Sequence, residues 1–269
     1  MLAESGTPAP PDSAVARRPL GYEVLLVLGV SLGANALYAL VSLIGSLTAA
    51  KPLAQQSATL NATAAPGRPW LDLAYQLLGI ATALVPVLLA GYLLGRDPAV
   101  AGTAGGVPGV LGLRPRAVRL DLGTGALLAA VIGVPGLGLY LAAHALGVNA
   151  AVVPAALPAV WWAVPVLVAS AIQNAVLEEV IVVGYLVTRL RQLRWPLPIV
   201  VGTSAFLRGS YHLYQGFGGF LGNAVMGLVF GLFFVRFRRL GPLVAAHALI
   251  DTVAFVGYAL FRSRLGFLH

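Results

Sequence analysis

The sequence predicts an all-α fold, a polytopic transmembrane helix bundle of about seven spans. Of the 269 residues, 59% are hydrophobic and only 10% are charged, whereas soluble domains carry about 25% charged residues. The mean hydropathy is +0.88. The apolar residues gather in runs of about 20 or more, which is the length that an α-helix needs to cross a bilayer. The chain therefore reads as an integral membrane protein.

Charge and cysteine content exclude several classes of function. The net charge is +8, but the Lys and Arg residues cluster in loops between apolar runs, where they set topology and meet anionic lipid. We therefore expect membrane lipids and no nucleic acid among the partners. The chain has no Cys, which excludes disulfides, Cys metal sites and Cys nucleophiles. Its many Ala, Gly, Leu, Val and Arg residues suit a bacterial plasma membrane.

The N-terminal half reads as a tail and three spans. Residues 1–19 are rich in Pro, Ala and Ser and predict a disordered cytoplasmic tail. Residues 20–158 then hold three N-terminal transmembrane helices, since their apolar runs are long enough to span a membrane. These runs cover residues 22–47, 70–94 and 121–147.

Residues 159–262 predict four more helices, which carry most of the chemically interesting side chains. The apolar runs cover residues 159–188, 196–214, 220–235 and 242–261. With seven spans, the clusters of basic residues in the loops of the whole chain fall on one side of the membrane, which is the cytoplasmic side. This distribution predicts a cytoplasmic N-terminus and an external C-terminus.

Two adjacent carboxylates, Glu178 and Glu179, interrupt an otherwise apolar run. A charged side chain at the bilayer centre costs roughly 3 kcal/mol on insertion scales, so the pair needs partners. Neighbouring helical residues point about 100° apart, which predicts that the two cannot face one partner directly. Asn174 lies one turn before Glu178 on the same face and is a supporting residue. The plainer interpretation is a protonated, hydrogen-bonded structural pair.

Candidate partners lie on the later spans. Arg208 precedes His212 by one turn, and a buried Arg there requires a carboxylate, which the Glu pair can supply. His247 and Asp251 share a helix face at spacing i, i+4, so the carboxylate can orient the imidazole. The plainer interpretations are an interfacial His212 in an aromatic belt and a self-satisfied His247–Asp251 pair.

These groups suit hydrolysis. A carboxylate beside an imidazole can take a proton from water, and a second imidazole can stabilise an oxyanion. The sequence contains no G-x-S-x-G and no HExxH motif. His212 and His247 with a carboxylate could instead bind zinc, because two His and a carboxylate form a catalytic zinc set.

The motifs resemble those of the CPBP family, the CAAX-processing and bacteriocin-processing proteases also called Abi or type II CAAX endopeptidases. The EExxxR motif reads Glu178 to Val183, followed by Gly184, with Val183 in the Arg position. The FxxxH motif ends at His212, with Arg208 in the Phe position. His247 and Asp251 match HxxxN or HxxxD. The resemblance covers roughly residues 159–261.

The resemblance implies an intramembrane endopeptidase, similar to CAAX prenyl proteases, with a catalytic core in the last four spans. It implies that Glu178 activates water with His212 assisting, and that His247 and Asp251 hold the oxyanion or bind a metal. It implies a supporting role for Glu179. The substrate class would be a lipidated or membrane-embedded peptide or protein. We expect Arg208 to replace the charge lost at Val183.

Two other functions stay open. A non-catalytic membrane scaffold or immunity protein of the same fold would explain the altered motif positions. A proton-coupled transporter would use Glu and His as a relay, although no inverted repeat is evident. The predicted spans also place His212 and His247 at different depths, unless the helix before His212 breaks or tilts near Gly209 or the predicted boundaries are wrong.

Overall fold

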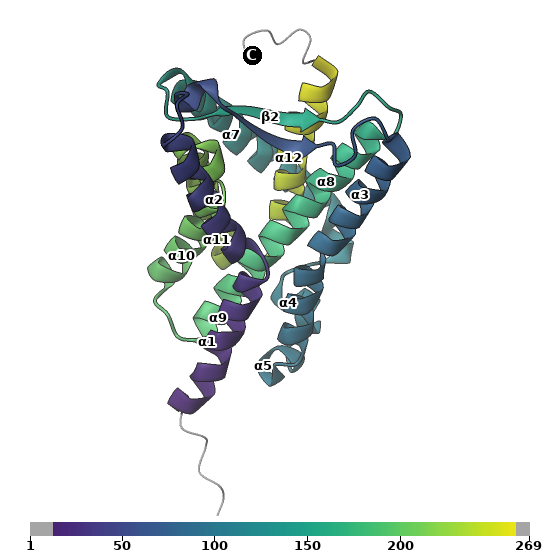
Figure 1. Cartoon of the computed structure of the whole chain (residues 1–269). Coiled ribbons are helices and arrows are strands. Elements are labelled where there is room, and N and C mark those ends of the chain that lie inside the picture. The colour runs from purple at the N-terminus through teal and green to yellow at the C-terminus, as the bar shows by residue number, and fades with distance from the viewer. Residues whose placement is uncertain (1–12, 262–269) are drawn as a thin grey trace, which may run out of the picture.

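The computed structural model describes residues 13–261 and is a bundle of helices (Figure 1). The predicted all-α, polytopic architecture is confirmed. Long apolar helices cross the molecule, and short helices and turns join them at its two ends. The main helices are α1 (Ser13–Gly29), α2 (Leu32–Leu47), α3 (Pro69–Ala83), α4 (Val85–Gly95), α7 (Val118–Ala145), α8 (Ala163–Glu178), α9 (Leu186–Gln192), α10 (Leu197–Ser210), α11 (Phe217–Phe237) and α12 (Gly241–Phe261).

The first predicted span consists of two helices. α1 and α2 meet at an angle of 53° across Val30 and Ser31, where the Ser31 hydroxyl donates to the Val27 carbonyl. Residues 13–19 begin α1, so this part of the predicted disordered tail is helical. Residues 1–12 lie outside the described range.

The predicted number of spans is not confirmed. Five helical segments of the described chain are long and apolar enough to cross a membrane, or six if α1 and α2 form one bent span. The predicted fifth span, residues 196–214, contains only the 14 residues of α10. At 1.5 Å per residue α10 is about 21 Å long, shorter than the roughly 30 Å hydrocarbon core. It therefore ends inside the bundle.

A small parallel sheet, which the sequence analysis did not predict, covers one end of the bundle. β1 (Ser57–Ala62) pairs with β2 (Ala151–Ala156), with Ser57 opposite Ala151. Both strands lie in segments that read as polar or Pro-containing loops, although β1 alternates polar and apolar residues over its six positions. β1 lies between α2 and α3 in the chain, whereas β2 lies between α7 and α8, so the sheet ties together two distant loops (Figure 1).

The continuous segment Ala163–Gln192 is the central element of the fold. Its apolar window is 67% buried, compared with 11% for the span made of α3 and α4 and 28% for α12. Between α8 and α9 the segment forms a π-helix, η3 (Glu179–Tyr185), all of whose residues are buried. Gly184 in this π-helix permits close packing, since a Cβ there would lie 2.7 Å from a methyl carbon of Leu111. The Glu pair thus sits on the most enclosed helix.

α10 and α11 form an antiparallel hairpin around small residues. A Cβ at Gly227 would lie 2.9 Å from the Ala205 Cα and 3.2 Å from the Arg208 Cβ. A Cβ at Gly209 would meet the Phe220 carbonyl oxygen at 2.8 Å. Small residues let membrane helices approach closely, and here they bring α11 against the turn of α10 that carries Arg208.

A buried ion cluster holds the end of the bundle opposite the sheet. Arg189 is 1% exposed; its Nε donates to Glu23 at 2.9 Å and its Nη1 to Asp97 at 2.6 Å. The Tyr185 hydroxyl donates to the same Glu23 oxygen at 2.9 Å. The cluster joins α1, the loop after α4, and α9. These segments lie together at the lower end in Figure 1.

Candidate functional site

The Glu pair lies where the helical geometry changes. Glu178 is the last residue of α8 and Glu179 is the first residue of the π-helix. A π-helix bonds i to i+5, which widens the turn, and such turns are frequent at functional sites. Both side chains contact Arg208 on α10, and Glu179 also contacts His247 on α12. This local widening was not evident from the sequence.

Arg208 is the centre of the buried polar cluster. It is fully buried, and its Nη2 donates to Glu178 Oε2 at 3.2 Å and also to Glu179 Oε1. Its Nη1 donates to Glu179 Oε2 at 3.3 Å. Its guanidinium carbon lies 5.3 Å from the centre of the Phe230 ring, a cation–π contact. One positive charge on α10 therefore neutralises much of the negative charge on the central helix.

The prediction that the two glutamates cannot share one partner is wrong. Arg208 contacts both of them, because the guanidinium presents its donors in a broad planar fork. The two carboxylates still differ in exposure. The side chain of Glu178 is 11% exposed, whereas that of Glu179 is 0% exposed. Glu178 is thus the member of the pair that meets the open space beside the cluster.

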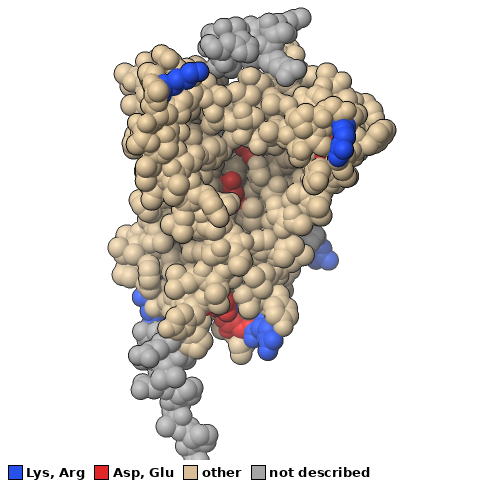
Figure 2. Space-filling model, in the orientation of Figure 1, with Lys and Arg blue, Asp and Glu red and all other residues tan. Residues whose placement is uncertain are grey.

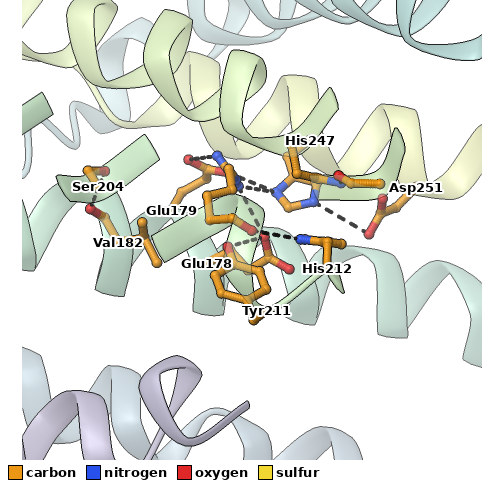
Figure 3. Close-up of polar contacts among 11 residues, drawn as sticks. Glu178, Glu179, Val182, Ser204, Tyr211, His212, His247 and Asp251 are labelled. Atoms are coloured by element: carbon orange, nitrogen blue, oxygen red, sulfur yellow. Dashed lines mark hydrogen bonds and ion pairs between the residues drawn. The ribbon is translucent and has the colours of Figure 1, made fainter. Parts of the chain in front are cut away.

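The His247 imidazole connects Glu179 to Asp251. Its Nδ1 lies 2.8 Å from Glu179 Oε1 and 3.1 Å from Arg208 Nη2, and its Nε2 lies 3.6 Å from Asp251 Oδ2 (Figure 3). When the ring is protonated, Nδ1–H donates to Glu179 and Nε2–H faces Asp251 and the cavity. A carboxylate that accepts from one ring nitrogen orients the imidazole and raises its basicity.

Tyr211 and His212 complete the cluster from the turn that follows α10. The Tyr211 hydroxyl donates to Glu178 Oε2 at 2.7 Å. His212 Nδ1 lies 3.0 Å from the Arg208 carbonyl oxygen, so it can donate there and leave Nε2 free. Sequence reasoning read Tyr211 only as part of an aromatic belt. Its position directly before His212 and one turn after Arg208 was the signal that could have identified it.

The short α10 resolves the mismatch in depth between the two histidines. The predicted span was too long at its C-terminal end, because α10 ends at Ser210, directly after Gly209. The chain then turns through Tyr211 and His212 into the short helix η4 (Leu213–Gln215). His212 therefore lies within the bundle, and it lines the same cavity as His247.

A large cavity adjoins the cluster. It has a volume of about 1770 Å³ and is lined by residues of α2, α3, α7, α8, α11, α12 and both strands. Figure 2 shows the corresponding hollow in the face between α2 and α3, with acidic side chains visible inside it. Five of the predicted site residues line the cavity, whereas Glu179 and Arg208 lie behind its surface. The five are Asn174, Glu178, His212, His247 and Asp251.

The predicted zinc alternative finds no matching ligand set. Among residues 13–261, no group of three or more His, Cys, Asp or Glu side chains is arranged to hold a metal ion. The Nδ1 atom of His247 also faces the Arg208 guanidinium, a poor neighbour for a cation. His212 and His247 therefore do not fit a zinc centre, and the chemistry considered below uses none.

The comparison with protein families agrees with the geometry. A family model described as Type II CAAX prenyl endopeptidase Rce1-like matches residues 160–253. This range includes the whole polar cluster, from Asn174 to Asp251, and confirms the predicted resemblance. A comparison with curated proteins gave no match. A comparison with solved structures gave none either.

Proposed function

We propose that this integral membrane protein is an intramembrane endopeptidase, a proposal supported by the match of residues 160–253 to the family model described as Type II CAAX prenyl endopeptidase Rce1-like. It hydrolyses a peptide bond of a lipidated or membrane-embedded substrate with water activated by Glu178 and His212. One observation carries the proposal. A carboxylate, two imidazoles and a second carboxylate line one cavity, directly in front of a buried arginine.

Glu178 serves as the general base. Its Oε2 atom is held by Tyr211 and Arg208, and its other oxygen has no hydrogen-bond partner among the described residues. That oxygen accepts a proton from a water molecule, while the water oxygen bonds to the carbon of the scissile carbonyl. His212 Nε2 positions the water. The carbonyl electron pair moves to its oxygen and forms a tetrahedral oxyanion.

His247 stabilises the oxyanion. With Nδ1–H donated to Glu179, a protonated imidazole donates its Nε2–H to the oxyanion that develops in the cavity, while the Asp251 carboxylate, 3.6 Å from Nε2, stabilises the positive charge of the ring. When the intermediate collapses, the C–N bond breaks and Glu178 returns its proton to the leaving amine. Glu179 and Arg208 act as positioning residues, because they hold His247 and Glu178 from behind the cavity surface.

The substrate reaches this site laterally from the membrane, near the end of the bundle that carries the sheet. The hollow lies between two lipid-facing helices, α2 and α3 (Figure 2), so a membrane-anchored segment has a lateral path to Glu178. The basic segments 96–119, 189–194 and 236–239 adjoin one another, since Arg189 pairs with Asp97 and the Leu240 N–H donates to the Leu111 carbonyl, and α5 (Pro98–Ala101) and α9 lie at the end opposite the sheet (Figure 1). With basic ends facing the cytoplasm, the N-terminus is cytoplasmic and the cavity lies toward the outer side of a plasma membrane.

The test is cleavage of a mixed library of membrane-anchored and farnesylated peptides by the purified protein in liposomes. We expect the wild type to cut at least one class of peptide, both with and without EDTA. Among the described residues, no group of three or more His, Cys, Asp or Glu side chains is arranged to hold a metal ion. His247→Ala should lose cleavage. The matched control is His144→Ala, whose imidazole contacts the Asn149 carbonyl outside the cluster and should matter little.

Each alternative result has a definite meaning. Loss of cleavage in EDTA with recovery in zinc would contradict activation of water by Glu178 and His212 alone. If the folded wild type cuts nothing, the non-catalytic scaffold becomes the better description. Proton flux that depends on Glu178, without cleavage, would indicate the transporter.

Tyr211→Phe is expected to lower kcat by about 10- to 100-fold with little change in KM. The lost hydroxyl donates to an ionised carboxylate, and such a hydrogen bond contributes roughly 1.5–3 kcal/mol. Initial rates measured on the cleaved peptide give the two constants. Tyr214→Phe is the matched control, since Tyr214 lines the same cavity and the hydrogen bond of its hydroxyl within residues 13–261 is with Gln215 rather than with Glu178. Equal losses in both variants would show that Tyr211 only shapes the cavity.

A further inference from the structure

The strand β1 lies over the mouth of the cavity. It belongs to the segment that joins α2 to α3, and these are the two helices that flank the hollow (Figures 1 and 2). Three of its residues, Thr59, Leu60 and Asn61, line the cavity together with Glu178 and His212. A strand edge therefore borders the space in which the proposed hydrolysis takes place.

The hydrogen bonds of the sheet show which edge of β1 is free. The Gln56 carbonyl accepts from the Ala151 N–H at 2.9 Å. Backbone groups alternate along a strand, so Ala58 and Leu60 also face β2, whereas Thr59 and Asn61 present their N–H and C=O groups to the other side. Among the described residues, no hydrogen bond reaches the backbone of Thr59 or Asn61 from that side.

The outer edge of β2 cannot take a further strand in the same way. The Val152 N–H, which points away from β1, already donates to the Tyr140 hydroxyl at 3.0 Å. The next outward position is Pro154, which has no N–H. A strand edge with unpaired N–H and C=O groups is a template for another extended chain. In this sheet only β1 offers one.

β1 is also coupled to the catalytic turn. Ala58 packs in one apolar cluster with Leu213 and Tyr214, which directly follow His212. A chain added beside Thr59 and Asn61 would therefore lie close to the turn that carries Tyr211 and His212. Thr59, Asn61 and Glu178 line the same cavity, and an extended segment advances about 3.3 Å per residue along such a cavity.

We propose that the substrate binds as an extended peptide that adds a third strand to the free edge of β1. This inference rests on the proposed function and specifies the conformation of its substrate. A peptide fits this edge better than a lipid chain does, because only a peptide backbone satisfies alternating donors and acceptors. Main-chain pairing provides affinity that does not depend on side-chain identity.

The absence of cysteine allows a direct test by disulfide crosslinking in Glu178→Gln protein, which should bind without cutting. The probe is a peptide with a Leu-rich transmembrane anchor and a ten-residue Val/Thr extension, carrying one Cys at each position in turn. With Thr59→Cys, we expect crosslinks at alternate peptide positions, since side chains on one face of a strand recur every second residue. Tyr38→Cys on α2, which lines the same cavity, should crosslink without this alternation.

N-methylation of the peptide backbone provides the second readout. Methylating two amides that face β1 should lower the affinity for the peptide about 30-fold, since each lost hydrogen bond contributes about 1 kcal/mol, whereas methylating the intervening amides should change little. Crosslinks to Tyr38→Cys without alternating crosslinks to Thr59→Cys would overturn the proposal, as would insensitivity to methylation. Binding is measured without cleavage, so a failed peptidase assay would leave this result interpretable.

Discussion

Glu178→Gln is expected to lower kcat by roughly 10²- to 10⁴-fold, the usual contribution of a general base. The amide keeps the shape of the side chain and can still accept from Tyr211 and Arg208, but it cannot take a proton from water. The measurement is the initial rate of cleavage of the peptide that the wild type cuts, with the helix content and melting temperature of both proteins recorded.

Glu179→Gln is the matched control, because it changes the same functional group one residue later. Glu179 is fully buried and does not line the cavity. We expect its amide variant to lose stability and part of its activity through displacement of His247, while a measurable rate remains. Complete loss at position 179 together with substantial activity at position 178 would reverse the proposed assignment of the base.

Arg208→Met is expected to destabilise the protein by about 3–5 kcal/mol, the cost of removing one partner from a buried ion pair. The variant leaves two carboxylates and an imidazole in the interior without their shared cation. The measurement is thermal unfolding in detergent micelles, with cleavage assayed below the transition. Cleavage should fall as well, because Arg208 orients both glutamates.

The double variant Glu179→Gln with Arg208→Met tests whether the loss arises from this pair. If Arg208 acts through Glu179, the double variant should be less destabilised than the sum of the single variants, because removing both charges leaves less unpaired charge. Strictly additive effects would show that Arg208 stabilises the fold through other contacts, such as its packing on Phe230.

The sequence was sufficient to predict a membrane protein and most of its helices, because an apolar run long enough to span a bilayer forms a transmembrane helix. It also indicated that Arg208 needs a carboxylate, since a buried guanidinium without one is costly. The roles of Glu178, Glu179, His212, His247 and Asp251 remain predictions, although the structure brings these residues together.

Other features followed from tertiary structure and left little trace in the sequence. The end of α10 at Ser210 depends on the turn that packs against α2 and β1, while the apolar pattern continues past it. The two strands pair across nearly a hundred residues, and the six alternating residues of β1 do not identify a partner so distant in the chain. No residue pattern distinguishes the π-helix from an α-helix in the sequence. It nevertheless places both glutamates within reach of one arginine. The contact of Tyr211 with Glu178 depends on two of these features, the end of α10 at Ser210 and the π-helix.

The π-helix also fixes the rotational phase between two anchored ends of one helix. At its start, Glu178 and Glu179 are attached to Arg208; at its end and one turn beyond, Tyr185 and Arg189 are attached to Glu23 and Asp97. Removing one residue between these anchors would rotate one end by about 100° relative to the other. Arg189 would then leave its carboxylates, or the glutamates would leave Arg208. Substitutions in this segment can be absorbed locally, whereas a change in its length cannot.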